Sequence, residues 1–199
     1  YEIGSGLVGS EMCIRDRLLS KVELKTTGNQ YVFGSDGVHL FQLDNKNFQL
    51  ILGESKIKGI LSKAVDEAFE SIEKVSNNPD NELRLIEKNI LSESFDEATT
   101  EFIKSLIVPL KRDKTISVDN AFGIFLGYTL DIDATQYSNS DFRNAVNEKL
   151  RNDLDEIASY IEKKINESGL TGYSFYFYIL PFNNAKDDRA AIINKLKGE

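Results

Sequence analysis

The chain has 199 residues, of which 32 are acidic and 24 are basic, and its formal net charge of −8 argues against a free-standing basic nucleic-acid binder. Its single cysteine excludes a disulfide framework. No apolar run approaches the roughly 20 residues that a membrane-spanning helix needs. We therefore expect a cytoplasmic protein without a membrane partner, long enough for one sizeable hydrophobic core.

The first 17 residues, YEIGSGLVGSEMCIRDR, match no secondary-structure pattern. A secretory signal needs an apolar stretch of about 7–15 residues, whereas residues 12–14 form the longest apolar run here. Back-translation in one reading frame gives a string that resembles the adapter and transposon end of transposase-based sequencing libraries, with Arg17 at the junction. We therefore treat residues 1–17 as a non-native, adapter-derived segment and residues 18–199 as a single domain whose native N-terminus is missing. Without the segment, the net charge is −7 and no cysteine remains.

Hydrophobic periodicity and turn residues divide the rest of the chain into strands and helices. Strands are expected over 18–33, with a turn at Gly28-Asn29, and over 38–43, 48–52, 121–133 and 173–182; helices are expected over 60–75, from Asp80 to Ile90, and over 95–107, 141–166 and 184–197. Early strands, central helices and two later strands predict an α/β (α+β) fold, with a mixed sheet flanked by helices.

The chemistry is expected in the hairpin formed by residues 38–43 and 48–52. Side chains two residues apart in a strand share a face, so Glu54 and Lys56 point the same way. A turn centred between Asn45 and Lys46 places Asp36 opposite Ser55, and a bulge at Gly34 or Gly37 would bring its carboxylate toward the other two groups. Two carboxylates and one ammonium thus meet at one end of a two-stranded ribbon.

Two close carboxylates repel each other unless a cation lies between them. Mg²⁺ is suited to such a site because it binds one or two carboxylates together with water and phosphate oxygens. The pattern of Asp36 followed by Glu54-Ser55-Lys56 is short, and an exposed strand end with a solvated Glu-Lys pair would show the same spacing. The apolar run FQLIL leads directly into Gly-Glu-Ser-Lys, however, which is typical of a buried strand that delivers a polar site at its end.

The segments GSDGVHLF, FQLILGESKI and AVDEAFESI together resemble the HamA C-terminal-like family, the nuclease subunit of the Hachiman anti-phage defence system. LIVPLKRD, the long helix and YFYILPF extend the resemblance over most of residues 22–197. It implies a PD-(D/E)xK restriction-endonuclease-like fold, Mg²⁺ or Mn²⁺ as cofactor, DNA as substrate and a helicase subunit as partner. It also implies that Asp36 and Glu54 are metal ligands and that Lys56 is the catalytic lysine. In such nucleases a helix before the first strand often adds an acidic residue, and here the adapter-like segment replaces it, so we expect a truncated N-terminal helix.

The family resemblance leaves two alternatives open, a catalytically inactive nuclease-fold module for complex assembly or nucleic-acid sensing, and an α/β domain whose strand ends happen to be charged. Lys58 continues the face of Glu54 and Lys56, so it is a candidate for substrate binding, although a solvated lysine would fit the same position. His39 alternates with Val38 and Leu40 and is interpreted as a core or supporting histidine. Asp131-Ile132-Asp133 is interpreted as a turn at a strand end.

Overall fold

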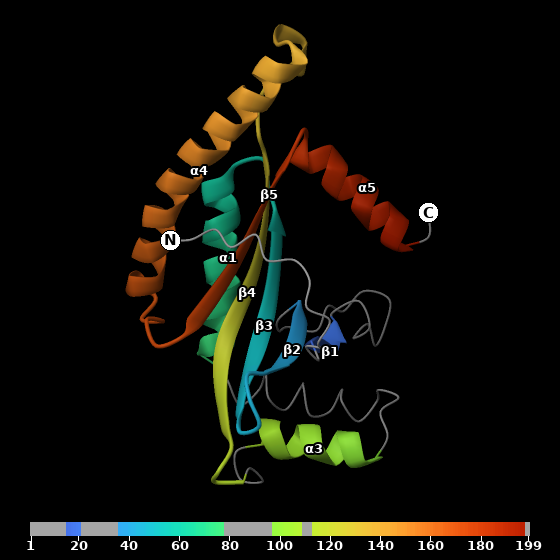
Figure 1. Cartoon of the computed structure of the whole chain (residues 1–199), viewed down its shortest axis with the longest axis vertical. Coiled ribbons are helices and arrows are strands. Elements are labelled where there is room, and N and C mark those ends of the chain that lie inside the picture. Colours follow the sequence, from blue (N-terminus) through green and yellow to red (C-terminus); the bar gives the residue numbers. More distant parts are fainter. Residues whose placement is uncertain (1–14, 21–35, 78–96, 109–112, 198–199) are drawn as a thin grey trace.

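The structure is a computed structural model that describes residues 15–20, 36–77, 97–108 and 113–197. Its regular elements are the strands β1 (Arg15–Ser20), β2 (Gly37–Gln42), β3 (Asn47–Ile57), β4 (Ser117–Thr129) and β5 (Ser174–Phe182), and the helices α1 (Leu61–Ser76), α3 (Glu97–Ile107), α4 (Asn139–Glu167) and α5 (Ala185–Lys197). The strands form one sheet in the order β1-β2-β3-β4-β5. The pairs β1/β2 and β2/β3 are antiparallel, whereas β3/β4 and β4/β5 are parallel. This mixed sheet flanked by helices confirms the predicted α/β class (Figure 1).

Most predicted elements within the described residues lie within a few positions of the observed ones. The largest difference is β3, which continues through Glu54 and Lys56 to Ile57 because β4 pairs with it along its whole length. Most of the strand predicted over 18–33 and the whole helix predicted after Asp80 lie outside the described residues.

β1 contains Arg17, the predicted junction of the adapter-like segment, and its register against β2 shifts between Arg17 and Leu19. Ladder hydrogen bonds join backbone groups and require no particular side chains. The pairing is therefore compatible with a segment of any origin, and the adapter origin of residues 1–17 stays a prediction.

The core lies between the sheet and α1, which packs on β3 and β4 and contacts α4 at its side (Figure 1). Ala64 and Ala68 are fully buried, and these small side chains let α1 approach the strands closely. Phe69 of α1 stacks on Phe175 of β5 with ring centroids 6.0 Å apart, and Phe175 also stacks on Phe122 of β4 at 5.3 Å. These three rings join α1 to the two parallel strands.

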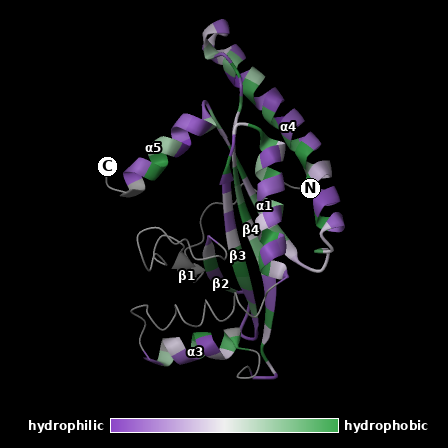
Figure 2. Ribbon diagram, turned by 180° about the vertical axis from the view of Figure 1, so that it is seen from behind, coloured by the Kyte–Doolittle hydropathy of each residue, from purple (hydrophilic) through white to green (hydrophobic). Residues whose placement is uncertain are grey.

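Hydrophobic and hydrophilic residues alternate along α1 and α4, as expected for helices with one face on a core and another in solvent (Figure 2). Within the described ranges, no helix has the length and apolar character needed to cross a lipid bilayer.

A polar cluster also ties α1 to α4. The Asp66 carboxylate of α1 accepts a hydrogen bond from the Tyr160 hydroxyl at 2.6 Å and lies 2.7 Å from Lys164 Nζ. Lys164, and then Tyr160, lower the pKa of Asp66, and Asp66 in turn raises the pKa of Lys164. The cluster therefore fixes the side of α1 that faces α4.

Candidate active site

The hairpin of β2 and β3 is paired one position differently from the prediction. Gly37 faces Gly53 and Gln42 faces Phe48, so Asp36 does not lie opposite Ser55 as predicted. The prediction was wrong because the connecting loop holds an odd number of residues: the N–H groups of Leu43 and Asp44 both donate to the Asn47 carbonyl, at 2.8 and 3.2 Å.

The loop is stabilised by the Asp44 carboxylate. Asp44 accepts hydrogen bonds from the backbone N–H groups of Lys46 and Asn47, at 2.8 and 2.9 Å, and from the Asn47 side chain at 2.7 Å. The Asn47 side chain, followed by the two backbone groups, lowers the pKa of Asp44. This Asx-type turn fixes the register that brings the other end of the hairpin together.

Asp36 lies at that other end and is bound to β3 by two hydrogen bonds. Its N–H donates to the Gly53 carbonyl at 2.7 Å, and its Oδ2 accepts from the Ser55 N–H at 2.9 Å. Because Gly37 also faces Gly53, two residues of one strand oppose one residue of the other, as in a β-bulge. A Cβ on Gly53 would lie 3.2 Å from the Gly37 carbonyl oxygen, so a larger residue here would push the two strands apart by a few tenths of an ångström.

Glu54 and Lys56 lie on the face of β3 that α1 covers. Glu54 is only 6 % exposed and forms an ion pair with Lys56 Nζ, and the Lys56 side chain is 21 % exposed. Their register partners on β4, Ile124 and Leu126, are fully buried, so the ion pair stands at the margin of the apolar core. A carboxylate in such surroundings is costly unless it is paired, and Lys56 provides the partner.

The structure thus brings three of the four predicted site residues to one place. The Asp36 carboxylate binds the amide of the residue between Glu54 and Lys56, and those two side chains bind each other. Lys58 instead pairs with Glu67 of α1, Nζ to Oε1 2.6 Å, with side chains that are 38 % and 43 % exposed. Sequence reasoning missed Glu67, whose only signal was its place on a polar face of the predicted helix.

Asp36 and Glu54 are the residues that would hold a divalent cation, and two carboxylates completed by water and phosphate oxygens form a donor set that suits Mg²⁺. No group of three or more His, Cys, Asp or Glu side chains suited to a metal ion occurs among the residues described. Any cation bound there would therefore keep several ligand positions for water and substrate.

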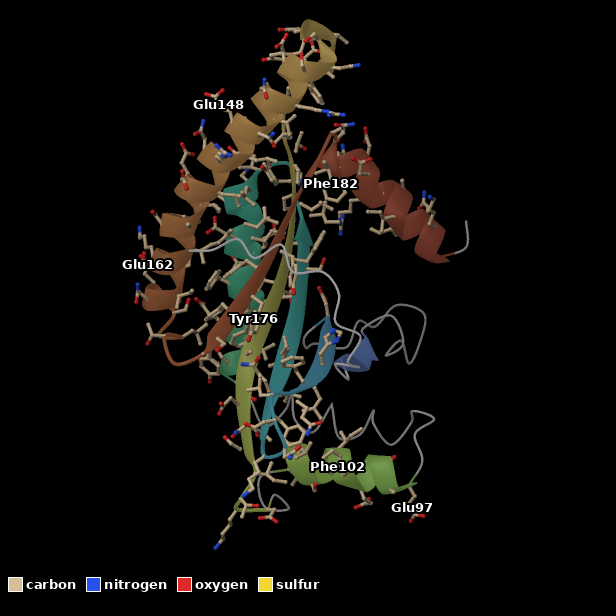
Figure 3. The ribbon with its side chains drawn as sticks, viewed as in Figure 1. Glu97, Phe102, Glu148, Glu162, Tyr176 and Phe182 are labelled. Carbon is tan, nitrogen blue, oxygen red and sulfur yellow. The ribbon has the colours of Figure 1, made fainter. Side chains whose placement is uncertain are left out.

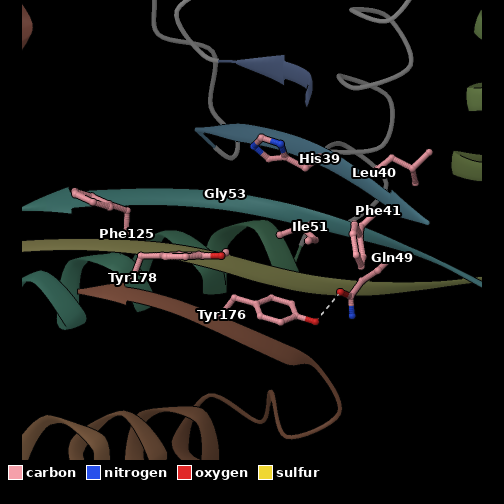
Figure 4. Close-up of a pocket in the computed structure, with 10 residues that line it drawn as sticks. His39, Leu40, Phe41, Gln49, Ile51, Gly53, Phe125, Tyr176 and Tyr178 are labelled. Carbon is pink, nitrogen blue, oxygen red and sulfur yellow. Dashed lines mark hydrogen bonds between the residues drawn. The ribbon is translucent and has the colours of Figure 1, made fainter. Parts of the chain in front are cut away.

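The other face of the sheet carries a separate hollow of about 370 Å³, bordered by His39, Ile51, Gly53, Phe125 and the tyrosines of β5 (Figure 4). His39 faces Ile51 and therefore lies on the face of the sheet opposite Glu54, and its interpretation as a core or supporting histidine stays a prediction. Tyr176 donates a hydrogen bond to Gln49 at 2.9 Å across this hollow.

Asp133 caps a short 3-10 turn, Ala134–Gln136, and accepts from the Thr135 N–H at 3.0 Å. The interpretation of this acidic run as a strand-end turn is confirmed.

Comparison with known proteins identifies one family that the chain matches. The family model HamA matches residues 10–196, a range that includes the hairpin and, within the described residues, every other helix and strand except the last residue of α5. No curated protein and no solved structure matches the chain. The family match confirms the resemblance found in the sequence. The chain therefore belongs to the HamA family, and this membership suggests a role in anti-phage defence.

Proposed function

We propose that the chain is a metal-dependent deoxyribonuclease of the PD-(D/E)xK type that acts with a helicase partner in anti-phage defence. The observation that carries this proposal is the convergence of Asp36, Glu54 and Lys56 at one end of the hairpin. The Asp36 carboxylate is held by the Ser55 amide, between the two residues that form the Glu54–Lys56 ion pair. Such a constellation supplies two anionic oxygen ligands and one cation at one end of two paired strands.

Each of the three side chains has a role in phosphodiester hydrolysis. Asp36 and Glu54 would hold Mg²⁺ or Mn²⁺, which when bound supplies charge stabilisation at the scissile phosphate and lowers the pKa of a bound water. The Lys56 ammonium, partly exposed beside Glu54, can orient the attacking water or offset negative charge that develops on the phosphate.

A partner that delivers DNA would complement the charge of the chain. Phosphate contacts made by basic side chains provide much of the affinity of proteins for DNA. The chain has a net charge of −8, which gives it no general attraction for DNA. We infer that a helicase subunit supplies most of the DNA contact and leads the strand to the hairpin.

A second candidate function, a catalytically inactive module for assembly or sensing, is favoured by the burial of Glu54. At 6 % exposure, this carboxylate has little access to solvent or to a substrate phosphate. The two candidates differ in whether DNA is cut.

Cleavage is tested with supercoiled plasmid, the full-length gene product and the product of the neighbouring gene. We expect nicked or linear DNA with Mg²⁺ or Mn²⁺ and none with excess EDTA, because phosphate hydrolysis at this site needs a bound cation. Readdition of Mg²⁺ should restore cleavage. Intact plasmid under every condition, together with preserved phage protection by Glu54→Ala, would assign the chain to the inactive-module class.

Lys58 is expected to bind a backbone phosphate once it leaves Glu67. An exposed ion pair of this kind contributes only about 0–1 kcal/mol, so DNA can displace Glu67 at little cost. In fluorescence anisotropy with a labelled oligonucleotide and Ca²⁺ in place of Mg²⁺, Lys58→Met should weaken binding several-fold and reduce the salt slope by about 1. Glu67→Gln should strengthen binding.

The double variant Lys58→Met/Glu67→Gln should bind as weakly as Lys58→Met, because Glu67 acts only through Lys58. Lys163→Met serves as the matched control, since Lys163 is also exposed and paired with a glutamate but lies on α4. Equal affinities for wild type, Lys58→Met and Glu67→Gln would remove Lys58 from the DNA-binding surface.

A further inference from the structure

The strand β5 leaves one edge of the described sheet without a neighbouring strand. It pairs with β4 over all nine residues, from Ser174 to Phe182, with no irregularity in register. Natural edge strands are usually protected by charged side chains, bulges, prolines or short length. β5 has no charged residue, and its one proline, Pro181, stands next to its end. Its outer edge is therefore suited to accept another strand.

Both faces of β5 present apolar surface beside this edge. On one face Tyr176, Tyr178 and Leu180 are 41 %, 61 % and 47 % exposed. On the other face a groove of about 610 Å³ runs between β5 and α4. The groove is lined mainly by Leu154, Ile157, Ala158, Ile161, Phe177 and Ile179. Figure 3 shows Tyr176 on β5 and Glu162 on α4, the two elements that border it.

We propose that a second copy of this chain pairs with β5 in antiparallel fashion, about a two-fold axis at Tyr178. This proposal is independent of the nuclease activity. Strand addition satisfies the backbone groups of an open edge and places alternate side chains in adjacent pockets. About this axis Phe177 faces Ile179 of the other copy on the groove side, and Tyr176 faces Leu180 on the opposite side. Aromatic and aliphatic side chains are favourable cross-strand neighbours.

The exposed charges of α4 favour a second copy over an unrelated protein. α4 and β5 border the same groove, so a two-fold axis at β5 also brings the two α4 helices together in antiparallel orientation. Arg151 and Glu162 are both exposed and lie 11 residues apart on one side of α4, close to three helical turns. Antiparallel alignment therefore places Arg151 of each copy toward Glu162 of the other. An isologous interface uses the same patch on both subunits, so that patch has to complement itself. The uncharged strand β5 and the side of α4 that carries Arg151 and Glu162 both meet this condition.

Sedimentation velocity of the full chain tests the oligomeric state. We expect a dimer with a dissociation constant on the order of micromolar. Leu154→Glu, at a position that is 45 % exposed, should raise this constant about tenfold or more while leaving the circular dichroism spectrum unchanged. Arg151→Glu and Glu162→Arg should each weaken the dimer, and the double charge reversal should restore it.

A cross-link locates the axis. In a Cys13→Ser background, Tyr178→Cys should form an intermolecular disulfide under mild oxidation, because facing Cα atoms in an antiparallel pair lie within disulfide range. Tyr137→Cys, also exposed but outside the interface, should remain a free thiol. A monomer at concentrations of about 100 μM would overturn the proposal, as would a dimer that resists Leu154→Glu and forms no disulfide through position 178. A monomer whose binding to the neighbouring gene product is lost in Leu154→Glu would also overturn it, and would assign the edge to that partner.

Discussion

Replacement of Glu54 with Gln is expected to lower Mg²⁺-dependent DNA cleavage by at least about 10²–10³-fold. The amide has the shape of the carboxylate but lacks its charge, so it is a poor ligand for a divalent cation and no longer pairs with Lys56. Lys56→Met should lose activity to a similar degree with metal binding retained. Cleavage is measured by plasmid nicking, and metal binding by Mn²⁺ titration followed by electron paramagnetic resonance.

Measurement of the free energy of unfolding of each variant distinguishes a direct loss of catalysis from misfolding. Each single substitution breaks the Glu54–Lys56 ion pair at the margin of the core, which is destabilising. The double variant Glu54→Gln/Lys56→Met removes both charges and should recover most of the lost stability while remaining inactive. Ser55→Ala is the matched control, because it keeps the backbone N–H that binds Asp36 and alters an exposed side chain. Cleavage within threefold of wild type by Glu54→Gln would remove Glu54 from the metal site.

The second large effect is expected from Phe69→Ala, which should reduce the free energy of unfolding by about 3–5 kcal/mol. Phe69 is 2 % exposed and connects α1 to β5 through its stacking on Phe175. Its truncation leaves a cavity that rigid strands cannot close. Since domains of this size are stable by only about 5–15 kcal/mol, the loss is a large fraction of the total.

The measurement is urea-induced unfolding followed by circular dichroism at 222 nm. Leu43→Ala is the control, because its side chain in the hairpin loop is 52 % exposed and should contribute less than about 1 kcal/mol. Phe69→Leu should fall between the two. A loss below about 1 kcal/mol for Phe69→Ala would mean that α1 is held mainly by other contacts, such as the Asp66–Lys164 pair.

The sequence predicted the elements more accurately than their pairing. Glu54 and Lys56 are two residues apart in a strand, so the face that they share was predictable from strand geometry alone. The register was not, because one side chain, Asp44, closes the loop with an extra residue. The contact between Lys58 and Glu67 depends on the direction in which α1 returns over the sheet, which no local pattern contains. The catalytic roles of Asp36, Glu54 and Lys56 and the substrate-binding role of Lys58 remain predictions.

The hydrogen bond between Asp36 and Ser55 has a consequence for how this site can vary. The group of residue 55 that holds Asp36 is its backbone N–H, and its side chain is exposed. Nineteen amino acids can provide that donor, and only proline cannot. The middle position of the Glu-x-Lys segment is therefore open to any side chain that suits a partner or a substrate, provided that its amide remains. Substitution of Ser55 can therefore change the surface of the site without moving the Asp36 carboxylate.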